Sequence, residues 1–219
     1  MKEHNIFISV GGTANEKQES FVSAIELRLK SENLIPNTVG RNKFSCDSPL
    51  KTIVELLDGC SGTIIIALER TYFPTGIEKR GGALESTLSN VKFPTPWNQI
   101  EAAMAYSKGL PIMLIIEEGL KNEGLIEQGH DWYILRVKLD NSSLYTPEFN
   151  GVLSSWKKKV EDYQYNKQIA ALNAKNIDPS TFTIGELVKG LKPSQFWAIL
   201  VALTGMISGA FLLGQYFGK

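Results

Sequence analysis

The chain has 219 residues, with 23 lysine and arginine residues against 23 aspartate and glutamate residues. This length allows one domain with a full core plus an appendage, and the balanced charge gives no support for a nucleic-acid-binding protein. Cys46 and Cys60 are far apart and we expect no signal peptide ahead of them, which favours reduced cytosolic thiols over a disulfide. His4 and His130 are isolated and the cysteines lack partner ligands, so no metal site is expected. No cofactor is expected either.

Strand-like and helix-like segments alternate through the first two thirds of the sequence. The apolar runs typical of strands are residues 6–10, 34–39, 62–68, 112–116 and 132–137. Helices are expected over residues 16–32, over 48–58 and from Pro96 onward, where apolar side chains recur every three or four positions. Such alternation indicates a parallel sheet covered on both faces. The predicted fold is therefore α/β, a flavodoxin-like parallel five-stranded sheet flanked by helices, within a domain of residues 1–150.

Residues 69–95 interrupt this alternation, because they show little periodicity and contain Gly76, Gly81 and Gly82. A loop of that length inside a compact domain is usually functional or disordered. We expect it to act as a lid over a pocket.

The segment after this loop carries the best candidate for chemistry. Thr95 can cap a helix and Pro96 suits its first position, after which Asn98, Glu101 and Ala105 share one helical face. A carboxylate near the start of a helix, beside the end of a sheet, lies where α/β domains place their ligands. A surface glutamate favoured by the helix dipole is the plainer alternative.

Further candidates lie at the ends of the first three predicted strands. Small residues after the first strand can admit a phosphate or ribose, arginines after the second and third can clamp phosphate, and a tryptophan can stack on a base. An ordinary tight turn, solvated arginines and a helix-packing tryptophan are the alternatives. The candidate binding residues are Ser9, Gly11, Gly12, Thr13, Arg41, Arg70, Trp97 and Asn98.

The C-terminal part differs in character. Residues 151–194 read as a polar helical stalk, whereas residues 196–213 contain no charge. With the residues that follow, this segment is long enough to cross a membrane, and we predict a single transmembrane helix over residues 195–217. Lys189 and Lys192 lie just before it, which places the N-terminal domain in the cytoplasm and the protein in the inner membrane. A helix docked on the core is the alternative.

Small residues recur at every fourth position within this predicted span. The pairs are Gly205 with Gly209 and Gly214 with Gly218. Such spacing lets helices approach closely in lipid, so we expect a homo-oligomer.

Several of these segments together resemble two related families. Residues 6–12, 48–58 and 62–68, with the helix that carries Trp97 and Glu101, are similar to nucleoside 2-deoxyribosyltransferases. The opening strand and the Trp-x-x-x-Glu spacing also resemble toll/interleukin-1 receptor (TIR) domains. The resemblance spans about residues 5 to 138. Both families act on the N-glycosidic bond between a ribosyl ring and a base, and their helix glutamate, here Glu101, is the nucleophile or the ribose-binding carboxylate.

Joined to a membrane span, such a domain resembles bacterial anti-phage effectors that act on or respond to nucleotides. The leading hypothesis is a membrane-anchored enzyme that cleaves or transfers an N-glycosidic bond of NAD or a nucleoside, with Glu101 as the catalytic residue. NAD or another nucleotide would then be the substrate or ligand. The rival hypothesis is a non-catalytic nucleotide sensor, whose ligand-driven oligomerisation clusters the transmembrane helices. A third is a structural adaptor that uses a TIR-like surface for homotypic contacts.

Overall fold

The computed structural model describes residues 3–121, 123–127, 132–175, 185, 192, 194–202 and 204–206. One compact unit extends from the N-terminus to Lys167, and a second comprises Gln168–Lys219. The candidate site belongs entirely to the first unit.

The centre of the first unit is a parallel sheet, as the alternating pattern predicts. Its strands are β1 (His4–Val10), β2 (Leu34–Asn37), β3 (Gly62–Ala67), β6 (Ile112–Glu117) and β7 (Ile134–Val137). They lie in the order β2-β1-β3-β6-β7, and every neighbouring pair is parallel. From β1 the chain first adds β2 on one side and then β3 on the other, so the carboxyl ends of β1 and β3 form the switch point where such folds bind ligands.

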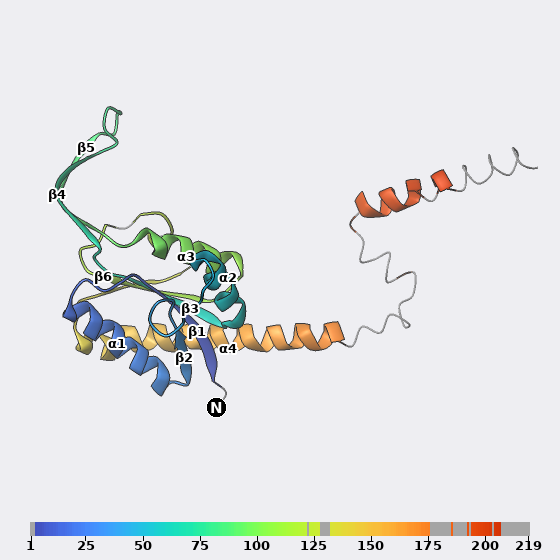
Figure 1. Cartoon of the computed structure of the whole chain (residues 1–219), viewed down its shortest axis with the longest axis horizontal. Helices are drawn as coiled ribbons and strands as arrows, with labels where there is room; N and C mark the ends of the chain where they lie inside the picture. The colour runs from blue at the N-terminus through green and yellow to red at the C-terminus, as the bar shows by residue number, and fades with distance from the viewer. Residues whose placement is uncertain are drawn as a thin grey trace, which may run out of the picture. The chain divides into compact units, whose positions relative to one another are not determined.

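Helices cover both faces of the sheet (Figure 1). One face carries α1 (Glu16–Ser31) and α4 (Pro147–Lys175), and the other carries α2 (Pro49–Gly59) and α3 (Pro96–Ser107). All six residues of β3 are buried, which is the pattern of a central parallel strand. Two short 3₁₀ helices, η1 (Gly124–Ile126) and η2 (Asn141–Tyr145), complete the compact unit.

Alternate residues of the strands supply the two halves of the core. Ile64 and Ile66 pack with α1 and α4, whereas Ile65 packs with Ala102 of α3 and Phe7 packs with α2. Because side chains along a strand alternate between faces, this division fixes which side of β1 and β3 faces α3.

The prediction of a loop over residues 69–95 is wrong, because the segment forms an antiparallel hairpin. Its strands are β4 (Thr71–Glu78) and β5 (Ser86–Phe93), paired from Thr71 opposite Phe93 outward. Figure 1 shows the hairpin as an arm that projects from the sheet. Most of its residues are exposed, so neither strand alternates between buried and exposed positions. The hydrophobic alternation that reveals a half-buried strand is therefore missing.

The boundary expected at residue 150 falls inside α4. Leu153, Trp156 and Val160 recur at helical spacing and are buried in the core. The indole Nε1 of Trp156 also donates a hydrogen bond to the carbonyl of Pro111 at 3.0 Å. The first part of the expected polar stalk is thus a structural element of the compact unit.

The predicted transmembrane span lies partly outside the described residues. Residues 194–202 and 204–206 are helical, whereas residue 203 and residues 207–217 are not described. Within the portion of the chain that the structure describes, no helix is long and apolar enough to span a bilayer.

Candidate active site

The start of α3 has the local structure that its sequence predicts. Thr95 has extended backbone angles, and its Oγ1 accepts a hydrogen bond from the backbone N–H of Trp97 at 3.4 Å. Pro96 occupies the first turn, where the N–H that proline lacks would have no partner within the helix. The cap fixes where α3 begins. Packing of Ala102 and Ala105 in the core then turns Asn98 and Glu101, which share their face of the helix, towards the sheet.

Asn98 joins α3 to the carboxyl end of β1. Its side chain is buried, and its Nδ2 donates to Ser9 Oγ at 2.9 Å and to the Ser9 carbonyl at 3.3 Å. The Oδ1 atom of the same amide is buried without a hydrogen-bond partner among the described residues. An unpartnered buried acceptor costs free energy, and such groups call for a functional or structural reason.

Glu101 lies one turn further along α3, on the same face as Asn98. The residue is 8% exposed, and this burial raises the pKa of its carboxyl to about 7, because water no longer stabilises the charged form. A hydrogen bond from Ser9 acts in the opposite direction but is the smaller effect. The Ser9 hydroxyl therefore links the Asn98 amide to a carboxyl group that can exchange a proton near neutral pH.

A crevice opens beside this cluster at the switch point between β1 and β3. Its walls include Gly11, Gly12, Arg70, Thr95 and Asn98. Added to Gly11, a Cβ atom would lie 2.9 Å from Cγ2 of Thr95, so only glycine allows this close approach. The volume is about 10 Å³, which holds about one water molecule. A ribose can enter only when the crevice widens.

Arg70 is the cation of the crevice. Its Nη1 donates to the carbonyl of Gly12 at 3.3 Å, in an exposed contact. The structure thus places this arginine on the rim, as expected from its position after β3.

Arg41 and Thr13 share a partner, Glu19, and neither residue lines the crevice. The Arg41 guanidinium donates to both carboxylate oxygens of Glu19, at 2.9 and 2.7 Å, and to Glu26 at 3.2 Å. Thr13 Oγ1 donates to the same Glu19 carboxylate at 2.7 Å. Arg41 and Thr13 hold the pKa of Glu19 low, at about 2. Arg41 therefore ties the segment after β2 to α1, and its charge is already compensated there.

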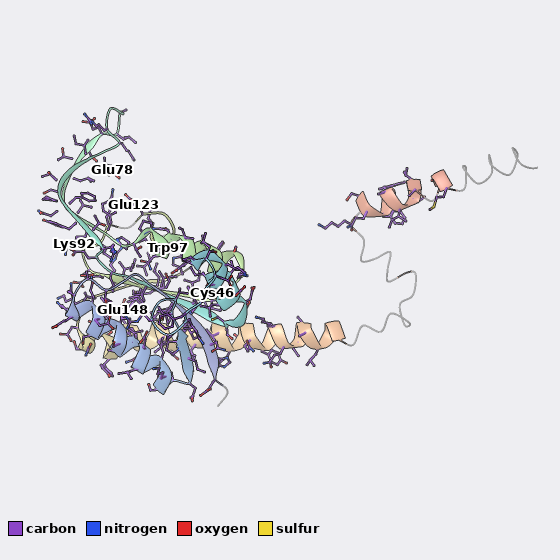
Figure 2. All side chains as sticks on the ribbon, in the orientation of Figure 1. Cys46, Glu78, Lys92, Trp97, Glu123 and Glu148 are labelled. Atoms are coloured by element: carbon purple, nitrogen blue, oxygen red, sulfur yellow. The ribbon has the colours of Figure 1, made fainter. Side chains whose placement is uncertain are left out.

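Trp97 lies at the start of α3 with 41% of its surface exposed. Its ring is not part of the crevice lining, and Figure 2 shows the residue at the N-terminal end of the helix.

The structure brings six of the predicted residues together. They are Ser9, Gly11, Gly12, Arg70, Asn98 and Glu101.

Two supporting residues are missing from the predicted set. Gln18 is buried, its Nε2 donates to the carbonyl of Glu69 at 2.9 Å, and its Oε1 accepts from Ala14 N at 2.7 Å. Glu69 lines the crevice and forms an ion pair with Lys92 at 2.5 Å. The sequence carries a signal for Gln18, because an asparagine cap followed three residues later by glutamine is a capping box. It carries none for the Glu69 pair.

Metal ligands are not gathered near this site. Across the described ranges, no group of three or more histidine, cysteine, aspartate or glutamate side chains could hold a metal ion.

No protein-family model and no curated protein matches the chain. Among solved structures, it is similar to that of a Clostridium botulinum CMP N-glycosidase, BcmB, at 14% sequence identity and a TM-score of 0.41. The match covers 64% of this chain and 96% of that chain. A similarity of this size identifies neither a family nor an activity for the present chain.

Proposed function

We propose that this chain processes a nucleotide or nucleoside by cleaving or transferring its N-glycosidic bond, with Glu101 as the catalytic residue. The observation that carries the proposal is the buried Glu101 carboxyl, whose pKa is raised to about 7 beside the switch-point crevice. The Trp97-x-x-x-Glu101 spacing, which resembles TIR domains, supports the same assignment.

The reaction needs a carboxylate close to C1′ of the ribosyl ring. When the bond from C1′ to the base nitrogen breaks, its electron pair leaves with the base and positive charge develops on C1′. An ionised Glu101 stabilises that charge strongly, because its surroundings are shielded from water. The carboxylate then either bonds to C1′ and is displaced by water or an acceptor hydroxyl, or it directs that nucleophile to C1′ and takes its proton.

The neighbouring residues have distinct parts in this proposal. The Ser9 hydroxyl, fixed by Asn98, orients the Glu101 carboxyl. Gly11 allows the turn after β1 to lie against Thr95, and Arg70 supplies a positive charge for a phosphate or diphosphate.

The proposal extends to location and biological role. The uncharged residues 196–213 would anchor the protein in the inner membrane as part of a single span over residues 195–217, with the N-terminal domain in the cytoplasm. Trp197, Val201 and Met206 are all more than half exposed, as expected of a helix that contacts lipid. Depletion or remodelling of a nucleotide such as NAD at that surface would suit a homo-oligomeric bacterial anti-phage effector.

The test compares full-length wild-type protein with Glu101→Gln and with Glu118→Gln, a control at an exposed carboxylate. Each is incubated with NAD, nucleosides and nucleoside monophosphates, and the released base is measured by liquid chromatography and mass spectrometry. We expect base release to fall at least about 100-fold in Glu101→Gln only. If the ionised form reacts, the rate in wild-type protein rises with pH through about 7. Unchanged release by Glu101→Gln would refute catalysis by this residue.

A second candidate function, a nucleotide sensor without turnover, is favoured by the small crevice of about 10 Å³. In a sensor, a ligand that widens the crevice would shift the domain between two states, and its binding would drive clustering of the chains. Deletion of residues 195–219 distinguishes the enzyme from the sensor. Base release by the shortened chain supports the enzyme, whereas ligand binding without release supports the sensor.

A further inference from the structure

A larger cavity lies between the N-terminus of α3 and the base of the hairpin. Its volume is about 410 Å³, within the usual range for sites that bind small molecules. Residues from three segments line it, including Phe73 and Phe93 of the hairpin, Gln99 of α3 and Lys121 of the segment after β6. None of these residues belongs to the Glu101 cluster.

The walls of this cavity are aromatic and its floor belongs to the core. Phe73 and Phe93 lie on the same face of the hairpin, since Thr71 is the partner of Phe93 and lies two positions from Phe73. Their rings meet edge to face with centroids 5.9 Å apart. Ile126 below them is 1% exposed and packs in the core with Ala102. Phe73 remains 48% exposed, which leaves ring surface for a planar ligand.

The cavity is held in shape by polar contacts around its rim. The backbone N–H of Lys121 donates to the carbonyl of Lys92 at 2.8 Å. The ammonium group of Lys121 binds Glu78 and also Glu123, the latter at 2.6 Å. Gln99 Nε2 donates to the Glu123 carbonyl at 2.5 Å. Figure 2 shows Lys92 near the hairpin base and Glu78 farther along the hairpin, where it forms the last pair of the two strands. A preformed cavity of this kind lowers the entropic cost of binding.

The chemistry of the lining selects the ligand. The Lys121 ammonium is already compensated by Glu78 and Glu123, so the cation of the described lining is not available to attract an anion. Thr71 adds a hydroxyl group at the edge of a space whose walls are Phe73, Phe93 and Ile126. A flat, neutral ring with polar edges fits an aromatic wall with such a rim, and a nucleobase is a ring of that class.

Thr95 lines this cavity and the switch-point crevice alike. We propose that the cavity between the hairpin and α3 is a nucleobase subsite for a nucleotide whose phosphate reaches Arg70 in the crevice. The identity of the ligand as a nucleotide rests on the proposed function. The hairpin then acts as a specificity element that contributes Phe73 as a stacking surface.

The test measures binding rather than turnover, in full-length protein carrying Glu101→Gln so that no probe is consumed. AMP, CMP and NAD are titrated by calorimetry, with ribose 5-phosphate as a probe that lacks a base. Phe73→Ala is compared with Tyr72→Ala, a matched control on the opposite face of the same strand, because Tyr72 is 47% exposed and absent from the cavity lining. Alanine substitution of a stacking ring typically weakens base binding by about 5- to 100-fold.

We expect Phe73→Ala to weaken binding of at least one base-containing probe by that factor, with ribose 5-phosphate and Tyr72→Ala unchanged. Three results would overturn the subsite. Phe73→Ala could bind the nucleotides as tightly as the protein with Phe73, Tyr72→Ala could lose as much affinity as Phe73→Ala, or none of the three nucleotides could bind. Failure of the catalytic proposal can be distinguished from failure of the subsite. If wild-type protein releases no base while Phe73→Ala still loses affinity, the subsite stands and Glu101 is not catalytic.

Discussion

Replacing Glu101 by glutamine should stabilise the protein at neutral and alkaline pH and leave its stability unchanged in acid. Glutamine keeps the shape of the side chain and a carbonyl oxygen that can accept from Ser9. It removes the charge that this buried position must hold when the carboxyl ionises. Comparison of this variant with wild type therefore measures the free energy of unfolding that is lost by keeping an ionisable group at position 101.

The size of the effect follows from the pKa of the Glu101 carboxyl, which burial raises from 4.5 to about 7. Each pKa unit corresponds to about 1.4 kcal/mol, so the full difference is about 3 kcal/mol. Because the folded-state pKa is the higher one, folding favours the protonated form. The associated stability is fully present below pH 4.5 and is lost as the pH rises through about 7. Glu101→Gln should thus gain about 3 kcal/mol over wild type at pH 8 and almost nothing at pH 4.

Urea unfolding of the full-length proteins at pH 4, 6 and 8 measures this difference, provided that the slope with denaturant stays constant. Glu118→Gln, at an exposed carboxylate, should show no comparable trend. Two results would show that burial does not disfavour the charged form of the Glu101 carboxyl. One is a gain in stability that does not depend on pH, and the other is a variant less stable than wild type at pH 8. The raised pKa would then be wrong, and with it the main support for the catalytic assignment.

Three other substitutions test the scaffold around the site. Gly11→Ala should destabilise the fold by about 1–3 kcal/mol in thermal unfolding, because its Cβ would lie 2.9 Å from Cγ2 of Thr95, and Thr95→Ser in the same chain should recover most of the loss. Arg41→Ala should cost about 1 kcal/mol above pH 5, and the cost should vanish as the pH falls towards 2, because Arg41 lowers the pKa of Glu19 to about 2; a loss that persists at pH 2 would contradict this. Trp156→Ala should cost about 3–5 kcal/mol in urea unfolding, since the ring is buried and donates to a backbone carbonyl.

The sequence is sufficient to predict the parallel sheet and the start of α3. Buried strands of β-branched residues alternate with helices, and short caps such as Thr95-Pro96 act locally, so neither depends on distant contacts. Helical spacing places Asn98 and Glu101 on one face of α3, but tertiary packing decides that this face, and not the one with Ile100, lies against the sheet. Ser9 could be predicted to lie near Asn98 and Glu101 because it is at the carboxyl end of the first strand, where α/β folds gather their ligand-binding residues.

Features that depend on long-range contacts could not be predicted in this way. The hairpin is exposed on both faces for most of its length and leaves no buried pattern to detect. Arg41 follows β2, as a phosphate-binding arginine would, but its partner Glu19 lies 22 positions earlier on another element. The cavity by Phe73 arises only because the hairpin base lies against the segment after β6.

The contact between Arg70 and Gly12 across the crevice is weaker than the contact between Gln18 and Glu69, and it indicates where the crevice can open. On the hairpin side, the backbone N–H of Arg70 donates to Phe93, and that of Glu69 donates to Glu117, both at 2.8 Å. Across the crevice, the Gly12 carbonyl is held by the Arg70 guanidinium through an exposed contact of 3.3 Å. A phosphate is a stronger acceptor for a guanidinium than a neutral carbonyl is. Binding of a phosphate to Arg70 would therefore replace the Gly12 contact. Gln18 would still tie Ala14 of the turn to Glu69, so only Gly11 and Gly12 could move away from Thr95 to admit a ribose.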